Sequence, residues 1–377
     1  MSIEIILGLP HLSRGALLER AKALQAPVLI SANCMSRWQD RKGWREWAGW
    51  RLGTLANATG LASLDLDSAG FVSTRAYGGF PWTVDDYIDL AASWPFRRFA
   101  SLDYCTEQEI ARDREEVLDR ISRTIRSNRD CMARAADRDI SERFMPVIQG
   151  RTPSDYERCL DALWPMLTPG RVIGVGSMCR REVGGRQGIV AVFEHLDRVL
   201  APGVKLHGFG IKGTALPYLV ALAHRITSID SQAYGTAARQ DALKRGVPKT
   251  DKLVADHLER WFHVQHARLR EPATRLTIEP AAANDDGVHG PWEQAIADAR
   301  REIRDLIESG DLDHTEITAG WVEQWAAELH HARAPGGLRE EGEGDGRARR
   351  ALKRPERPFP CSTTSLTAIT RHSIPAR

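Results

Sequence analysis

The stretch Ser63–Phe71, which reads SLDLDSAGF, indicates the fold of this chain. Its apolar residues are typical of a buried β-strand, and the strand ends at a carboxylate, Asp67, before a tight turn of small residues. α/β enzymes keep their chemistry where parallel strands end, at the mouth of a barrel or the edge of an open sheet. Asp103 and Asp230 also end apolar runs. Three aspartates at three strand ends predict one shared site.

Short apolar runs alternate with amphipathic stretches along the first 230 residues. Strands are expected at 3–8, 27–31, 62–66, 98–102, 144–149, 171–175, 204–209 and 226–230. Helices are expected at 13–24, 41–56, 83–92, 107–136, 153–163, 188–200 and 214–224. The helix at 41–56 is favoured by the spacing of tryptophans, at Trp38, Trp44, Trp47 and Trp50. Eight alternating units predict a parallel sheet closed into a (β/α)8 TIM barrel, with an open doubly wound sheet as the alternative.

Beyond Asp230 the pattern becomes helical only, at 234–245, 252–270, 292–308 and 315–333. We therefore expect a catalytic barrel over residues 1–250 and a helical appendage over 251–333. Gly, Arg, Glu and Pro dominate residues 334–377. Such a composition cannot form a packed core, so it predicts a disordered C-terminal tail.

Composition places the chain among globular proteins, with 377 residues, 42% apolar and 27% charged. The formal charge of +2 neither supports nor excludes a nucleic-acid surface, which would depend on how charge is distributed. Six scattered cysteines without a CxxC motif favour reduced thiols. The first ten residues do not resemble a leader and no apolar run approaches about 20 residues. A cytoplasmic protein without membrane contact is expected.

The aspartates differ in their sequence neighbours, which favours different roles. Asp230 ends a β-branched run, and a buried carboxylate there can attack a sugar carbon through a covalent intermediate. Asp67 precedes Phe71, whose ring could cover a flat base, an interaction of about 1–3 kcal/mol. The structural alternative for any one aspartate is a cap on the following turn.

Other strand ends carry polar groups that suit a purine. Gln149 offers both a donor and an acceptor, and Asp103 can accept hydrogen bonds from a ring N–H and an exocyclic amine of guanine. The glycines of GVGS at 174–177 allow a close backbone approach, although no dinucleotide signature is present. The motif HGFG at 207–210 is expected to be a further strand end that faces the site, with an ordinary backbone turn as the alternative. Taken alone, Gln149 fits an ordinary loop amide better than a base-binding group.

Basic residues near these motifs suit phosphate groups. Arg180 and Arg181 directly follow the glycine turn, and Arg239 and Lys249 belong to a basic set after Asp230. The alternative for the second set is a solvated helix face. Two histidines three residues apart, His263 and His266, have no companion ligands, so no metal is expected.

In chain order these motifs resemble the queuine tRNA-ribosyltransferase (tRNA-guanine transglycosylase) superfamily. Within it they look closest to the deazapurine DNA modification proteins of the DpdA type. DSAGF at 67–71 is similar to the Asp-Ser-Gly-Gly-aromatic motif, with Ala69 in place of one glycine. SLDYC at 101–105 resembles the base-recognition segment, VIQG at 147–150 the glutamine-glycine motif, and GVGS the glycine turn. The resemblance covers about residues 27–245.

The resemblance implies base exchange at a guanosine in a nucleic acid. Asp230 would attack C1′ and expel guanine, and a 7-deazaguanine such as 7-cyano-7-deazaguanine would then replace it. Asp67 would assist proton transfer. The implied substrate-binding residues are Asp103, Gln149, the Gly176 backbone, Phe71 and Ser68.

One departure bears on the polymer. The tRNA enzymes carry a Cys-x-Cys-x-x-Cys plus His zinc site after the barrel, whereas this chain has no cysteine between Cys179 and Cys361. The departure favours DNA over tRNA as the substrate. The implied chemistry needs no metal or redox cofactor. A base must leave the duplex first, at a cost of a few kcal/mol, and a DNA-opening ATPase partner would lower that cost. The alternatives are a tRNA enzyme, an inert nucleic-acid-binding paralogue and an unrelated barrel hydrolase.

Overall fold

Parallel strands form one continuous sheet in this computed structural model, which describes residues 2–41, 44–107, 111, 113–271, 290–312 and 319–333. Within those residues the sheet has nine strands in the order β7-β6-β5-β2-β1-β11-β10-β9-β8. They are β1 (Glu4–Leu9), β2 (Val28–Ser31), β5 (Leu64–Asp67), β6 (Arg98–Ala100), β7 (Phe144–Met145), β8 (Val147–Ile148), β9 (Val172–Val175), β10 (Lys205–Gly208) and β11 (Ile226–Ser231). All eight predicted strands are confirmed.

The sheet closes at a single interrupted strand. Only Pro146 separates β7 from β8, and proline cannot donate to a strand ladder. β7 pairs with β6 and β8 pairs with β9, so the two halves of that strand join the sheet edges. The predicted TIM barrel of eight β/α units is therefore confirmed, and the open sheet is wrong.

Strand alternation decides which polar side chains share a face. Asp65 and Asp67 lie two residues apart on β5, and Ser228 and Asp230 lie two apart on β11. Asp65 lies toward the amino-terminal end of the barrel, where Arg97 contacts it at 2.7 Å. Asp67 and Asp230 are consequently at the opposite end, where the strands finish.

Helices flank the strands largely where the sequence predicts them. They are α1 (Ala16–Leu24), α3 (Val84–Ala92), α4 (Arg114–Asp137), α5 (Pro153–Ala162), α6 (Ile189–Val199), α7 (Leu216–Leu219), α8 (Ala233–Arg245) and α9 (Asp251–Arg268). Thr83 and Thr152 form capping boxes with Asp86 and Asp155, which fix the starts of α3 and α5. One helix was not predicted: α2 (Gly70–Tyr77) begins directly after the Asp67 turn.

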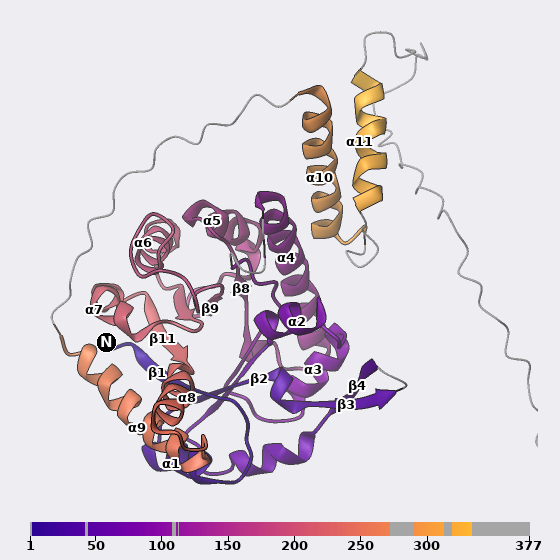
Figure 1. The fold of residues 1–377 in the computed structure, drawn as a ribbon. Helices are drawn as coiled ribbons and strands as arrows, with labels where there is room; N and C mark the ends of the chain where they lie inside the picture. The colour runs from indigo at the N-terminus through magenta and orange to yellow at the C-terminus, as the bar shows by residue number, and fades with distance from the viewer. Residues whose placement is uncertain are drawn as a thin grey trace, which may run out of the picture. The chain divides into compact units, whose positions relative to one another are not determined.

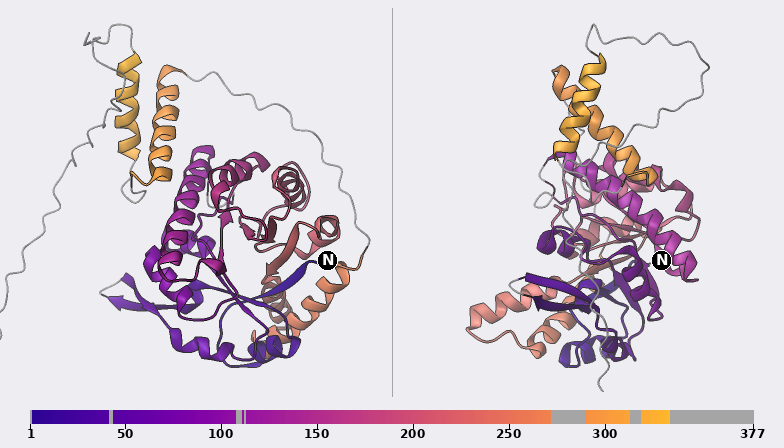
Figure 2. Two further views of the ribbon diagram at one scale, coloured as in Figure 1. Left: turned by 180° about the vertical axis from the view of Figure 1, so that it is seen from behind. Right: turned by 90° about the vertical axis from the view of Figure 1, so that its right-hand side faces the viewer.

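The predicted helix at 41–56 is wrong. β3 (Ser36–Arg41) and β4 (Trp44–Trp50) form an antiparallel hairpin that stands out from the barrel in Figures 1 and 2, and a 3-10 helix covers Leu52–Ala58. Tryptophans three residues apart imitate a helix face, but aromatic residues also favour strands, and Trp38 pairs with Trp47 across the hairpin. Gly49 has a φ of 96°, which no α-helix accommodates.

Two further helices follow the barrel in the chain, α10 (Pro291–Ser309) and α11 (Ala319–Arg333). Arg304 of α10 binds Glu115 and Asp119 of α4 at 3.0 and 3.1 Å. The domain boundary at residue 250 stays a prediction, and the predicted tail at 334–377 lies outside the described residues. Among the helices that are described, none is long and apolar enough to span a membrane.

Candidate active site at the barrel mouth

Three aspartates gather at the carboxyl-terminal mouth of the barrel. Asp67 ends β5, Asp230 is the penultimate residue of β11, and Asp103 lies in the loop after β6. Burial and the nearby charges of Asp103 and Asp230 raise the pKa of the Asp67 carboxyl to about 7. The three aspartates that the sequence singles out therefore lie at the same end of the barrel.

The turn after Asp67 fixes its position. The Ala69 N–H donates to Asp67 Oδ2 at 3.1 Å, and Ala69 adopts the left-handed region with a φ of 72°. At the next position, a Cβ atom on Gly70 would overlap the backbone oxygen of Asp103. The small residues of this turn therefore bring two acidic strand ends together.

Asp103 belongs to a buried chain of hydrogen bonds. Ser68 Oγ donates to Asp103 Oδ1 at 2.5 Å, and the Gln149 side-chain amide donates to Oδ2. Ser177 Oγ in turn donates to Gln149 Oε1 and accepts from the Thr106 N–H at 2.8 Å. The network fixes which way the Gln149 amide points. Burial raises the pKa of Asp103, and the hydrogen bonds from Ser68 and Gln149 oppose that rise.

Gly176 makes room for this network. A Cβ atom on Gly176 would overlap the Gln149 amide. The Gly176 N–H already donates to the Ile148 carbonyl at 3.0 Å, and Tyr156 Oη donates to the Gly176 carbonyl at 2.7 Å. In the structure described here the glycine therefore acts through its lack of a side chain, and a contact between its backbone and a base stays a prediction.

Asp230 is held by one of its two oxygens. The Gly210 N–H donates to Oδ1 at 3.0 Å, and His207 Nε2 lies 3.4 Å from the same atom. His207, which is fully buried, also contacts Ser228 Oγ through Nδ1 at 2.9 Å. Oδ2 of Asp230 receives no hydrogen bond from the residues that the structure describes. His207 was not among the predicted site residues, although the strand end HGFG marked its position.

Phe71 lies in the first turn of α2 and is half-buried. The guanidinium carbon of Arg180 lies 5.3 Å from its ring centroid, within the range of a cation–π contact. One face of the ring is thus covered by an arginine that would have to move, or share the ring, when a base binds.

The four predicted nucleic-acid-binding residues lie in different surroundings. The Arg181 guanidinium donates to the carbonyls of Ser177, Gly150, Arg151 and Gln187. Arg239 and Lys249, by contrast, are exposed, on α8 and in the segment after it. Arg181 is therefore engaged in holding loops together, and phosphate binding by any of the four stays a prediction.

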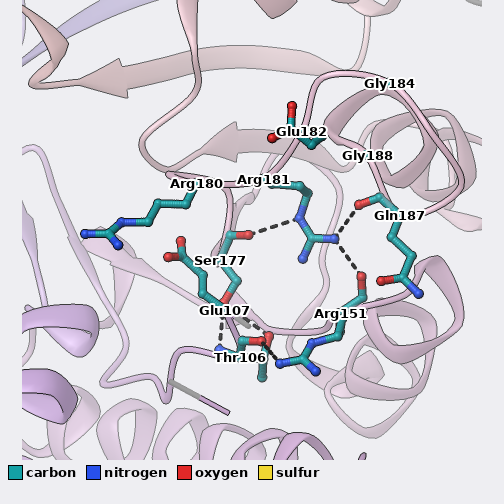
Figure 3. Close-up of a pocket in the computed structure, with 10 residues that line it drawn as sticks. All are labelled: Thr106, Glu107, Arg151, Ser177, Arg180, Arg181, Glu182, Gly184, Gln187 and Gly188. Atoms are coloured by element: carbon teal, nitrogen blue, oxygen red, sulfur yellow. Dashed lines mark hydrogen bonds between the residues drawn. The ribbon is translucent and has the colours of Figure 1, made fainter. Parts of the chain in front are cut away.

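A pocket of about 520 Å³ adjoins the network on the side of Ser177 and Thr106 (Figure 3). Figure 3 shows Arg181 bridging the carbonyls of Ser177, Gln187 and Arg151 along its wall. Glu107 also lines it, and burial raises the pKa of this carboxyl against hydrogen bonds from backbone N–H groups. The sequence offered no signal for Glu107, which follows the aspartate motif in an irregular loop.

Metal ligands do not gather in the described part of the chain. No group of three or more His, Cys, Asp or Glu residues there is placed to hold an ion. His263 and His266 lie on α9, where His266 packs against Phe262 with ring centroids 4.3 Å apart.

Comparison with protein families matches residues 48–308 to DpdA, DeoxyPurine in DNA protein A. The match spans more than half of the chain and includes the three aspartates, Gln149 and His207. No curated protein matches the chain. The DpdA family is itself related to the tRNA-guanine transglycosylases. With its barrel and the motif order at the barrel mouth, the chain therefore belongs to the DpdA family.

Proposed function

We propose that this protein exchanges guanine in DNA for a 7-deazaguanine, such as 7-cyano-7-deazaguanine, through a covalent intermediate on Asp230. The observation that carries the proposal is the convergence of Asp67, Asp103 and Asp230 at one mouth, with three different sets of neighbours. Membership of the DpdA family supports DNA as the polymer.

The first half of the reaction expels guanine. The free oxygen of Asp230, Oδ2, attacks C1′ of the target nucleotide, and the bond from C1′ to N9 breaks with its electron pair passing to the base. Asp67, whose pKa of about 7 leaves it partly protonated at neutral pH, donates a proton to the leaving guanine. The Gly210 N–H holds the other oxygen of Asp230 in place, and His207 Nε2 lies 3.4 Å from that oxygen.

The second half inserts the new base. Asp67, now a carboxylate, accepts the N9 proton of the incoming 7-deazaguanine, and N9 attacks C1′. The ester bond to Asp230 breaks and the carboxylate is regenerated, so protons and electrons balance over the cycle. This chemistry requires neither a metal nor a redox cofactor.

The Asp103 network selects the base. Asp103 accepts hydrogen bonds from the ring N–H and the exocyclic amine of a guanine-type edge, while Ser68 and Gln149 keep the carboxylate in position. Gly176 leaves space for the Gln149 amide. Phe71 then stacks on the base as Arg180 moves off its ring. Because both guanine and a 7-deazaguanine carry this edge, one reader serves both halves of the exchange.

The polymer contacts follow from exposed charge. Arg180, Arg239 and Lys249 contact phosphates of the strand that carries the target, and Arg181 supports the loop beside them. Extrusion of a base from duplex DNA costs a few kcal/mol, so a DNA-opening ATPase partner would speed the reaction on duplex DNA and leave single strands unaffected.

The test is base exchange with radiolabelled guanine, offered separately with plasmid DNA and with bulk tRNA. Label retained in DNA is expected, and Asp161→Asn, which alters an exposed carboxylate on α5, serves as the matched control for Asp230→Asn. Label in tRNA alone would make the protein a tRNA enzyme. Release of unlabelled guanine without incorporation would make it a hydrolase, and neither event, in the presence of single-stranded DNA, would indicate an inert paralogue.

A further inference from the structure

A second pocket, of about 750 Å³, lies beside the loop that carries Asp103. Its lining includes Phe80, Trp82, Tyr104, Arg123, Arg126 and Asp130. Tyr104 directly follows Asp103 in the chain, so the base reader and the pocket wall belong to one loop. None of the three site aspartates lines the pocket. The pocket is therefore a neighbour of the reacting centre and not a part of it.

Aromatic rings form one continuous wall of this pocket. Trp82 and Phe80 have centroids 5.8 Å apart, and Phe80 meets Tyr104 edge to face at 5.5 Å. Behind them, Trp50 of the hairpin lies 4.9 Å from Trp82. Trp82 is only 3% exposed and Tyr104 8%, so both are fixed by packing, while Phe80 is half-buried. A flat ligand would therefore meet the Phe80 ring, with Trp82 and Tyr104 fixed behind it.

Two polar donors in the wall lack acceptors. Trp82 Nε1 and Arg123 Nε are buried without a hydrogen-bond partner among the described residues. The Arg123 guanidinium carbon lies 5.8 Å from the Tyr104 ring centroid. Arg126 differs, because Asp130 neutralises it at 2.7 Å. The pocket thus combines rings with one guanidinium that no described carboxylate pairs, which suits a ligand that is aromatic and anionic.

We propose that this pocket binds the nucleotide next to the target guanine in the DNA strand, with its base against Phe80 and its phosphate at Arg123. The proposal rests on the proposed function, which brings a DNA strand to Asp103, the residue before Tyr104 of the pocket wall. Aromatic side chains combined with basic groups are how proteins hold single-stranded nucleic acid. A purely apolar ligand would leave the Arg123 guanidinium beside it without a counter-charge. Capture of the neighbour would keep the target base out of the helical stack and over Asp103.

The test compares two single-stranded DNA probes by fluorescence anisotropy with the full chain and no free base. One is a fluorescein-labelled oligothymidylate with a single central dG, and the other replaces the residues on both sides of the dG with abasic sites. Stacking of about 1–3 kcal/mol predicts binding weaker by about 5- to 150-fold for the abasic probe. Because the probe carries the change, this result does not depend on whether a variant folds.

Variants then assign the loss to the pocket. Phe80→Ala and Arg123→Gln should weaken binding of the intact probe and shrink the difference between the two probes, as expected of coupled groups. Phe80→Leu and Arg123→Lys provide milder changes if the first pair folds poorly. Trp164→Ala removes a ring that is 52% exposed and does not line the pocket, and it should leave the difference unchanged.

Several outcomes would overturn the proposal that this pocket binds the neighbouring nucleotide. These are equal affinity for both probes, competition by free thymidine monophosphate at the strand's own affinity, and tighter binding of the matching ribo-oligonucleotide. Equal affinity for the intact and abasic probes, together with normal incorporation of guanine into DNA, would refute nucleotide binding in the pocket. The proposed function would be unaffected. Discrimination between the probes without any incorporation would support the pocket and remove the exchange reaction.

Discussion

Two aspartates on the same strand have opposite surroundings. Asp65 and Asp67 are two residues apart on one face of β5. Burial opposes ionisation of Asp65, but hydrogen bonds and charges from Arg97 and Arg98 outweigh it and lower its pKa. Asp67 meets other carboxylates instead, and its pKa rises to about 7. One strand thus supplies a paired carboxylate toward the amino-terminal end of the barrel and, at the mouth, the carboxylate that we propose as the proton donor.

The contrast teaches that position along a barrel strand decides the role of a buried carboxylate. At the amino-terminal end, the paired charges of Asp65, Arg97 and Arg98 stabilise the fold, and Asp65 stays ionised near neutral pH. At the mouth, unpaired carboxylates are costly to keep together and are retained where chemistry uses them. Substitutions at the two ends should therefore separate activity from stability.

The largest expected effect is at the mouth. Asp230→Asn keeps the shape of the side chain but removes the attacking oxygen, so exchange should fall by on the order of 10³-fold or more. The Gly210 N–H can still donate to the remaining carbonyl oxygen, so the thermal midpoint should stay within a few degrees. Incorporation of radiolabelled guanine and a thermal melt on the same preparation measure both. Normal incorporation would remove Asp230 as the nucleophile.

At the amino-terminal end of the barrel, a substitution should reduce stability more than activity. Asp65→Asn leaves the Arg97 and Arg98 guanidiniums without a buried counter-charge, which should cost about 3 kcal/mol of unfolding free energy. Denaturant titration measures the loss. Exchange per folded molecule should remain near that of the unaltered protein, because the mouth is unchanged. A variant that is stable but inactive would contradict the division between the two ends.

Asp67 should show its function in the pH dependence. Because the protonated form donates to the leaving base, single-turnover release of guanine should fall about tenfold per pH unit above a pH of about 7. Asp67→Asn should remove this dependence and slow release by about 10²-fold or more. Quenched-flow measurement from pH 5 to 9 provides the profile, and a profile that is flat in the unaltered protein would exclude Asp67 as the acid.

The two carboxyl groups should also give opposite slopes of stability with pH. The folded state raises the pKa of Asp67 above its unfolded value of about 4, so its contribution is present below pH 4 and lost as the pH rises through about 7. The folded state lowers the pKa of Asp65, so its contribution is present above pH 4 and lost as the pH falls. Asp67→Asn should therefore gain stability relative to the unaltered protein between pH 5 and 8, and Asp65→Asn should lose most of its deficit in acid.

A smaller effect, on base selectivity, is expected at Asp103. Asp103→Asn replaces an acceptor with a group that can also donate, so discrimination between guanine and adenine as incoming bases should fall by about 10-fold. Competition between the two labelled bases measures this ratio. Loss of exchange with unchanged selectivity would assign Asp103 to catalysis and not to recognition.

The smallest effect concerns phosphate contacts. Arg239→Gln and Lys249→Gln should each reduce the slope of log affinity against log salt by about 1. Arg198→Gln, which changes an exposed arginine on α6, is the control and should leave the slope unchanged. Equal slopes in all three variants would place the strand elsewhere on the protein.

The sequence predicted the barrel because parallel strands buried on both faces read as continuous apolar runs, and the aspartates ended those runs. It failed at the hairpin, where Trp47 and Trp50 repeat at a spacing that helices and aromatic clusters share. It also did not single out His207, since the contact with Asp230 depends on how β10 and β11 align. The local sequence pattern predicts whether a segment is a helix or a strand. The contacts that support the site depend on the register between neighbouring strands, which the local pattern does not contain.

The contact between Gly176 and Gln149 limits how this site can evolve. A side chain at position 176 would displace the Gln149 amide from its hydrogen bonds with Asp103 and Ser177, so that substitution costs less after residue 149 has become smaller. In the reverse order, the intermediate keeps Gln149 but loses those hydrogen bonds. Selection for an altered base preference should therefore recover substitutions at residue 149 before substitutions at residue 176. The two positions should change together.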